Sequence, residues 1–160
     1  MATMQRSNKL TEMDNAFTHL LRVRYSECDA QKVVFNAKYV EYIDIAFTEF
    51  MRQVWGDYND MLSSGIDSQV VNVNIDWTAP AYFDDILAIR LKTTHIGNTS
   101  YTVQADFTNH KSGTKIASAK IVYVMVSANE HKKIPIPEEM KSQLSRGAPG
   151  TTTNHAGIQL

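Results

Sequence analysis

Residues 25–39 read YSECDAQKVVFNAKY, and this stretch joins a short strand to a long amphipathic helix. Asp29 lies where the strand ends, and Asn36 lies where the helix should begin. The first backbone N–H groups of a helix lack intrahelical partners, so they can hold a carbonyl oxygen that is gaining negative charge. The stretch therefore predicts a carboxylate beside an oxyanion site, a minimal arrangement for cleaving an activated ester.

The helix expected after this turn carries one wide apolar stripe. Asn36 is predicted to be its N-cap, with a side chain that accepts a hydrogen bond from the first turn. Gly56 is suitably placed to end the helix after about five turns. The stripe recurs at steps of three and four residues and contains Tyr39, Tyr42, Ile43, Ala46, Phe47, Phe50 and Val54.

On both sides of this helix the pattern changes to the period-two alternation of strands. One strand is expected before it and four after it, with short helices near residues 58–63 and 138–144. Consecutive strands tend to be neighbours, which favours an antiparallel meander for the last four. We therefore expect an α+β fold in which a long helix lies against a five-stranded antiparallel sheet. The predicted strands cover residues 19–25, 69–77, 86–95, 100–108 and 116–127.

The chain length of 160 residues fits one domain with a single core. We expect this domain over residues 18–145. Residues 1–17 are expected to form a leader that can be mobile. Residues 146–160 lack periodicity and are expected to form a flexible tail.

Composition excludes several classes of function. A formal net charge of -1 gives no pull toward nucleic acid or anionic membrane. No apolar run approaches the length of a membrane span, no Cys/His cluster has metal-ligand spacing, and no glycine-rich loop indicates a nucleotide cofactor. Cys28 is the single cysteine, which favours a reducing, cytoplasmic setting. We expect no metal, no cofactor, no nucleic-acid partner and no membrane partner.

Several segments together resemble the hotdog-fold acyl-CoA thioesterases of the 4-hydroxybenzoyl-CoA thioesterase type. The strongest are residues 23–31, VRYSECDAQ, and residues 33–42, VVFNAKYVEY. Weaker similarities follow at residues 76–81, 97–101 and 135–137, in the order and spacing of that family. The resemblance covers about residues 18–145.

The resemblance implies an acyl-CoA substrate and a homodimer or homotetramer with active sites at a subunit interface. It implies that Asp29 is the catalytic carboxylate, acting as nucleophile or general base, and that the backbone N–H at Asn36 polarises the thioester carbonyl. Many relatives carry glycine where this chain has Lys32, and many carry His or Tyr where it has Asn36. An imidazole-dependent step at position 36 is therefore not open to this chain.

Substrate contacts are expected from Val34, Phe35, Tyr39 and Ser100. Tyr39 would border the acyl pocket, and Ser100 would touch the pantetheine arm. The residues leave alternatives open, since Asp29 could simply serve the turn, Tyr39 could be core, and Ser100 could be a strand-edge hydroxyl. A non-catalytic acyl-thioester binding module and a hotdog hydratase also remain as alternative functions. The acyl group is not determined by the sequence.

Overall fold

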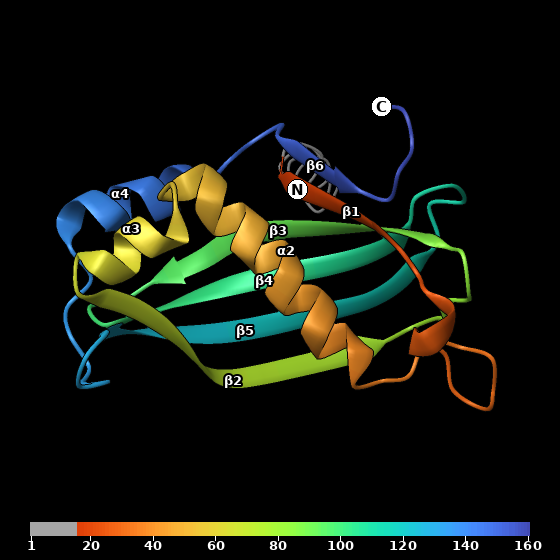
Figure 1. Cartoon of the computed structure of the whole chain (residues 1–160), viewed down its shortest axis with the longest axis horizontal. Helices are drawn as coiled ribbons and strands as arrows, with labels where there is room; N and C mark the ends of the chain where they lie inside the picture. Colours follow the sequence, from red (N-terminus) through yellow and green to blue (C-terminus); the bar gives the residue numbers. More distant parts are fainter. Residues whose placement is uncertain (1–15) are drawn as a thin grey trace, which may run out of the picture.

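A computed structural model describes residues 16–160, and in that range a single mixed sheet lies against one long helix (Figure 1). The sheet has six strands in the order β2-β5-β4-β3-β1-β6. The predicted leader therefore lies almost entirely outside the described residues. The strands are β1 (Phe17–Arg22), β2 (Ile66–Trp77), β3 (Ile86–Ile96), β4 (Ser100–Asn109), β5 (Lys115–Ser127) and β6 (Thr152–His155).

The order of the strands differs from the predicted meander. Strands β3, β4 and β5 follow one another as antiparallel neighbours, as expected. Strand β2, however, pairs with β5 and not with β3, so residues 78–85 lead from the edge strand β2, past β5 and β4, to β3 in the interior of the sheet. The place beside β3 is taken by β1, which pairs with it antiparallel. Alternation patterns cannot identify which strands are neighbours, because every strand of the sheet carries the same periodicity.

The second departure lies at the C-terminal end, where a flexible tail was expected. Residues Thr152–His155 form β6 and pair with β1 in parallel, which makes the sheet six-stranded and mixed. Beyond β6, Ala156 is buried against Leu20 and Ala88. A polar sequence such as TTNH has no strand pattern of its own, so its structure comes from the edge of β1 that it covers.

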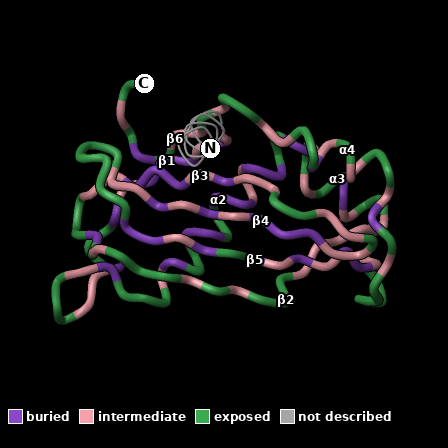
Figure 2. The backbone as a smooth tube through the Cα atoms, turned by 180° about the vertical axis from the view of Figure 1, so that it is seen from behind, coloured by how far each residue is buried: buried purple, intermediate pink, exposed green. Residues whose placement is uncertain are grey.

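The long helix α2 (Lys38–Val54) crosses one face of the sheet and buries the predicted stripe (Figure 1). Its Phe47 ring stacks on Tyr123 with ring centroids 4.0 Å apart, and Tyr123 stacks on Tyr101 at 5.2 Å. The short helices α3 (Tyr58–Ser63) and α4 (Glu138–Arg146) lie together at one end of the molecule. Figure 2 shows the buried residues gathered along the central strands and a largely exposed β2 at the edge.

The start of α2 corrects the prediction for Asn36. The helix begins at Lys38 with Ala37 as the N-cap residue, and no side chain caps it. The N–H groups of Lys38 and Tyr39 are already bonded to the carbonyls of Phe35 and Asn36, at 2.9 and 3.3 Å. The Asn36 side chain therefore finds no free donor in the first turn. Among the described residues, no helix is long and apolar enough to cross a membrane.

Candidate active site

A tight turn holds Asp29 between β1 and α2. After the single 3-10 turn η1 (Tyr25–Glu27), the chain doubles back on itself. The Asp29 N–H donates to the Val33 carbonyl at 2.9 Å, and Cys28 and Val34 form an antiparallel bridge. These bonds make a small two-stranded ladder with Asp29 near its tip.

Lys32 has a left-handed backbone, with φ of 62°. Its N–H donates to the Asp29 carbonyl at 2.9 Å and so closes the turn. A residue with a Cβ pays on the order of 1–2 kcal/mol for this conformation. The turn adopts this shape with a lysine despite that cost.

Asp29 serves the turn with one carboxylate oxygen only. Oδ1 accepts a hydrogen bond from the Gln31 N–H at 2.8 Å, the geometry of an Asx turn. Within the described residues no donor is bound to Oδ2, and the side chain is half-buried. The turn role that the sequence left open is therefore present, and it leaves one oxygen for another partner.

The chain directly before α2 supplies the backbone donors. Within the described part of the chain, no acceptor is bound to the N–H groups of Asn36 and Ala37. Both residues are exposed and stand at the positive end of the α2 dipole. Phe35 pairs with Glu27, two residues before Asp29. Asn36 therefore lies about three residues along the ladder from Asp29, which at about 3.3 Å per strand residue is roughly 10 Å.

The four residues expected to contact substrate fall into different places. Val34 is buried and donates its N–H to the Ala81 carbonyl, whereas Phe35 is 48% exposed beside the turn. Tyr39 is buried in the core, with its ring against Trp77 and Phe107. Burial raises the pKa of Tyr39 to about 12, so its hydroxyl stays protonated at neutral pH.

Ser100 is not brought to Asp29 within one protomer. It begins β4, whereas Phe107, which contacts the Tyr39 ring, lies near the other end of that strand. A rise of about 3.3 Å per residue separates Ser100 and Phe107 by roughly 20 Å. The serine therefore lies at the opposite end of the sheet from the turn.

Sequence reasoning missed a second carboxylate beside the turn. Glu27 is only 2% exposed, and its oxygens accept hydrogen bonds from Arg24 and from the Tyr42 hydroxyl. Burial alone would raise the pKa of Glu27, but these hydrogen bonds outweigh it and hold the pKa below its usual value. One signal in the sequence could have found it: an acid at position 27 is a suitable acceptor for the hydroxyl of Tyr42 on the buried stripe of the helix. Periodicity alone only assigns that tyrosine to the core.

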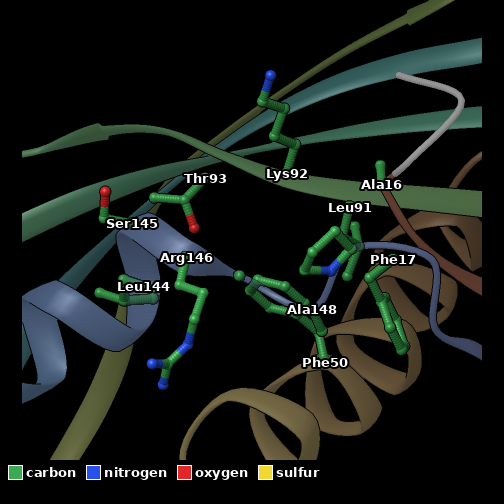
Figure 3. A pocket seen from close by; sticks show the side chains of 12 residues that line it. Ala16, Phe17, Phe50, Leu91, Lys92, Thr93, Leu144, Ser145, Arg146 and Ala148 are labelled. Atoms are coloured by element: carbon green, nitrogen blue, oxygen red, sulfur yellow. The ribbon is translucent and has the colours of Figure 1, made fainter. Parts of the chain in front are cut away.

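A separate cavity of about 310 Å³ lies between β1, α2, β3 and α4 (Figure 3). Phe17, Phe50, Leu91 and Leu144 give it an apolar floor. Neither Asp29 nor Asn36 lines it, so it is not part of the turn site. Among residues 16–160, no group of three or more His, Cys, Asp or Glu side chains is arranged to hold a metal ion.

The family model of the thioesterase-like superfamily matches residues 23–144 of this chain. The chain belongs to the thioesterase-like superfamily. The match begins just before the Asp29 turn and ends within α4, so both β1 and β6 lie outside the matched residues.

The alignments of this thioesterase-like protein with named relatives extend over nearly the whole length of those relatives. A "putative esterase" of Aquifex aeolicus is 26% identical over 78% of this chain and 94% of its own. The long-chain acyl-CoA thioesterase FadM of Escherichia coli is 25% identical over 79% of this chain and 95% of its own. The acyl-CoA thioester hydrolase YbgC of Escherichia coli O6:H1 is likewise 25% identical, over 79% and 93%.

Solved structures show the same fold. A 1,4-dihydroxy-2-naphthoyl-CoA thioesterase from Synechocystis aligns with a TM-score of 0.73 at 22% identity, covering 81% of this chain and 95% of that one. A thioesterase-superfamily protein from Jannaschia aligns with a TM-score of 0.76 at 21% identity, covering 84% and 94%. The expected α+β hotdog class of this thioesterase-like protein is confirmed, with the corrections to strand number and order given above.

Proposed function

We propose that this chain is an acyl-CoA thioester hydrolase that releases a carboxylic acid and free coenzyme A. Within its superfamily we assign it to the 4-hydroxybenzoyl-CoA thioesterase type. The observation that carries the proposal is the combination at the turn of a carboxylate oxygen and two backbone N–H groups, none with a partner among the described residues. The names of FadM and YbgC support the acyl-CoA substrate.

The chemistry needs an attacking oxygen and a place for the charge that develops on the carbonyl oxygen. The N–H groups of Asn36 and Ala37 supply the second, and one such donor is worth about 10²–10³ in rate. Asp29 supplies the first by one of two routes. It attacks the carbonyl carbon, expels the thiolate and leaves a mixed anhydride for water to open, or it takes a proton from a water that attacks instead.

Isotopic oxygen separates the two routes. In a single turnover in H₂¹⁸O, attack by Asp29 puts ¹⁸O into the Asp29 carboxylate when water opens the anhydride at the aspartyl carbon. General-base attack puts ¹⁸O only into the released acid. If water opens the anhydride at the acyl carbon, the products match the second route, so trapping the acyl-enzyme with hydroxylamine completes the comparison.

A homodimer would explain why Ser100 lies far from the Asp29 turn of its own subunit. The β2 edge is free of a neighbouring strand in the described residues, and its Val70, Val71 and Trp77 are 47%, 59% and 48% exposed. Such an edge is a template for pairing with another copy. In a homodimer joined there, Ser100 of the partner subunit would contact the pantetheine arm, while Val34, Phe35 and Tyr39 border the acyl group. A homotetramer would be a pair of such dimers.

The decisive experiment is thiol release from short, long and aromatic acyl-CoAs by the native chain and by Asp29→Asn. We expect kcat to fall at least about 10²-fold in the variant, because an amide cannot attack or take a proton. Asp57→Asn is the matched control, since Asp57 also accepts from the N–H two residues on, at 2.7 Å from Asn59. Full activity of Asp29→Asn would remove Asp29 from its role. No thiol release from any acyl-CoA would indicate a binding module instead.

A further inference from the structure

The carboxylate of Glu27 lies buried at the base of the Asp29 turn, and both of its oxygens accept hydrogen bonds. Oε2 accepts from the Arg24 N–H and from the Tyr42 hydroxyl, both at 2.7 Å. Oε1 accepts from Nε and Nη2 of Arg24, at 2.8 and 2.5 Å. Four donors on two oxygens fix the carboxylate in one orientation.

The backbone of Glu27 forms the base of the turn ladder. Its carbonyl accepts the Phe35 N–H at 2.9 Å, below the Cys28–Val34 bridge and the Asp29–Val33 bond. A shift of Glu27 would therefore carry both strands of the ladder with it. Asp29 lies at one end of this ladder, and Asn36 follows directly at the other.

Tyr42 connects this ladder to the long helix. It lies about one turn into α2, is 1% exposed, and packs edge-on against Tyr39 with centroids 6.0 Å apart. The hydrogen bond from its hydroxyl to Glu27 spans the space between the turn and the helix. It is the side-chain bond that sets where the turn lies relative to the first residues of α2.

Stability alone does not account for a charge in this place. Arg24 is 68% exposed, and a pair between a buried acid and a solvated base gains little net stability. A fully bonded carboxylate instead specifies one geometry.

We propose that Glu27, acting through Tyr42, is a positioning residue that holds Asp29 at its working distance from the backbone donors of Asn36 and Ala37. The assignment rests on the thioesterase function proposed above. Neither side chain touches the reacting atoms in this role. A displacement of about 1 Å in a catalytic group can cost up to about 10²-fold in rate, so a loosened turn would slow chemistry while leaving binding of the acyl-CoA intact.

The kinetic test compares Glu27→Gln and Tyr42→Phe with the native chain, at a temperature where all are folded. We expect kcat to fall about 10- to 100-fold in Glu27→Gln and several-fold in Tyr42→Phe, with KM changed less than about twofold. The double variant should be no slower than Glu27→Gln, because both changes break the same connection. Tyr58→Phe is the matched control, since it removes a tyrosine hydroxyl bonded to Asp67 at 2.7 Å, on α3. It should leave kcat unchanged.

Amide hydrogen exchange provides a readout that does not depend on activity. Glu27→Gln and Tyr42→Phe should speed exchange at the Asp29 and Phe35 N–H groups at least about tenfold, with the central strands still protected. Tyr58→Phe should not. Unchanged exchange at the turn, or equal loss of kcat in Tyr58→Phe, would overturn the positioning role. A native chain without thioesterase activity would overturn the proposed function instead, and exchange would still decide whether Glu27 holds the turn.

Discussion

His19 is a histidine that the fold keeps uncharged. It is fully buried on β1, its Nδ1 lies 2.7 Å from the Thr153 hydroxyl, and its ring meets the His155 ring edge-on at 4.6 Å. Burial, followed by repulsion from His155, lowers the pKa of His19 to about 4. His155 in turn faces Glu49 at 3.8 Å. Charging His19 would put a cation beside His155, and its buried Nε2 has no hydrogen-bond partner among the described residues.

This predicts a stability that falls on acidification. The unfolded chain binds a proton at His19 near pH 6.5 and the folded chain only near pH 4, so stability is complete above about 6.5 and is lost as the pH falls toward 4. The shift corresponds to up to about 3 kcal/mol. Urea unfolding of the native chain and of His19→Gln at pH 7, 6, 5 and 4.5 measures it. The native chain should lose more free energy than the variant, and parallel losses would contradict the prediction.

The two carboxylates at the turn, Asp29 and Glu27, differ in how far the neighbouring sequence predicts them. Asp29 was found from its place between a strand and a helix, a local feature. Glu27 was missed, because its burial and its hydrogen bond from the Tyr42 hydroxyl, 15 residues away, arise only in the fold. Ser100 was proposed from resemblance, and only the fold shows that it lies at the far end of β4.

Among the elements, β6 lies beyond the residues that the family model matches. It covers β1, and Ala156 beyond it closes the small cluster with Leu20 and Ala88. The Arg22 Nε also donates to the Ala156 carbonyl at 3.1 Å. The segment therefore seals the outer side of β1.

A chain that ends at Gly150 should fold but be less stable. Exposing Leu20 alone costs about 1.5–3 kcal/mol, while the core between α2 and the other strands stays intact. Far-UV circular dichroism should change little, and chemical unfolding should show the loss. A chain without only Gln159 and Leu160, both exposed, is the control. Equal stability of the two shortened chains would mean that β6 contributes nothing.

The elements also show where sequence patterns succeed. The stripe on α2 predicted every buried residue of the helix except Met51, since a helix presents every third or fourth residue to the same surface. The predicted N-cap, Asn36, was wrong by one residue, because the bonds from Lys38 and Tyr39 to preceding carbonyls are decided by the turn before the helix.

At the scale of the whole molecule, β2 is an edge strand with no neighbour on its outer side among the described residues. Twelve residues of β2 lie outermost in the sheet, with a register shift between Val70 and Asn72 that leaves Val71 out of the pairing with β5. An exposed edge with apolar residues of this kind favours pairing with a second copy.

Val71→Lys should therefore weaken assembly. A lysine at this exposed site puts like charges close together across a two-fold interface, so sedimentation should show the native chain at two or four times the mass of one chain and the variant shifted toward one. Val40→Lys, at an exposed valine on α2, is the control and should not shift. A native chain that sediments as a monomer would contradict the edge-pairing proposal.

The sequence by itself determined the α+β class, the long helix with its buried face, most of the strands, and the Asp29 turn. All of these are written in residues close together along the chain, as periodicity or as a short motif. Tertiary structure decided the neighbours of β2, the parallel strand β6, the burial of Glu27 and His19, and the distance of Ser100 from the turn. These depend on contacts between segments far apart in sequence, whose free energies arise only when the packed core brings them together.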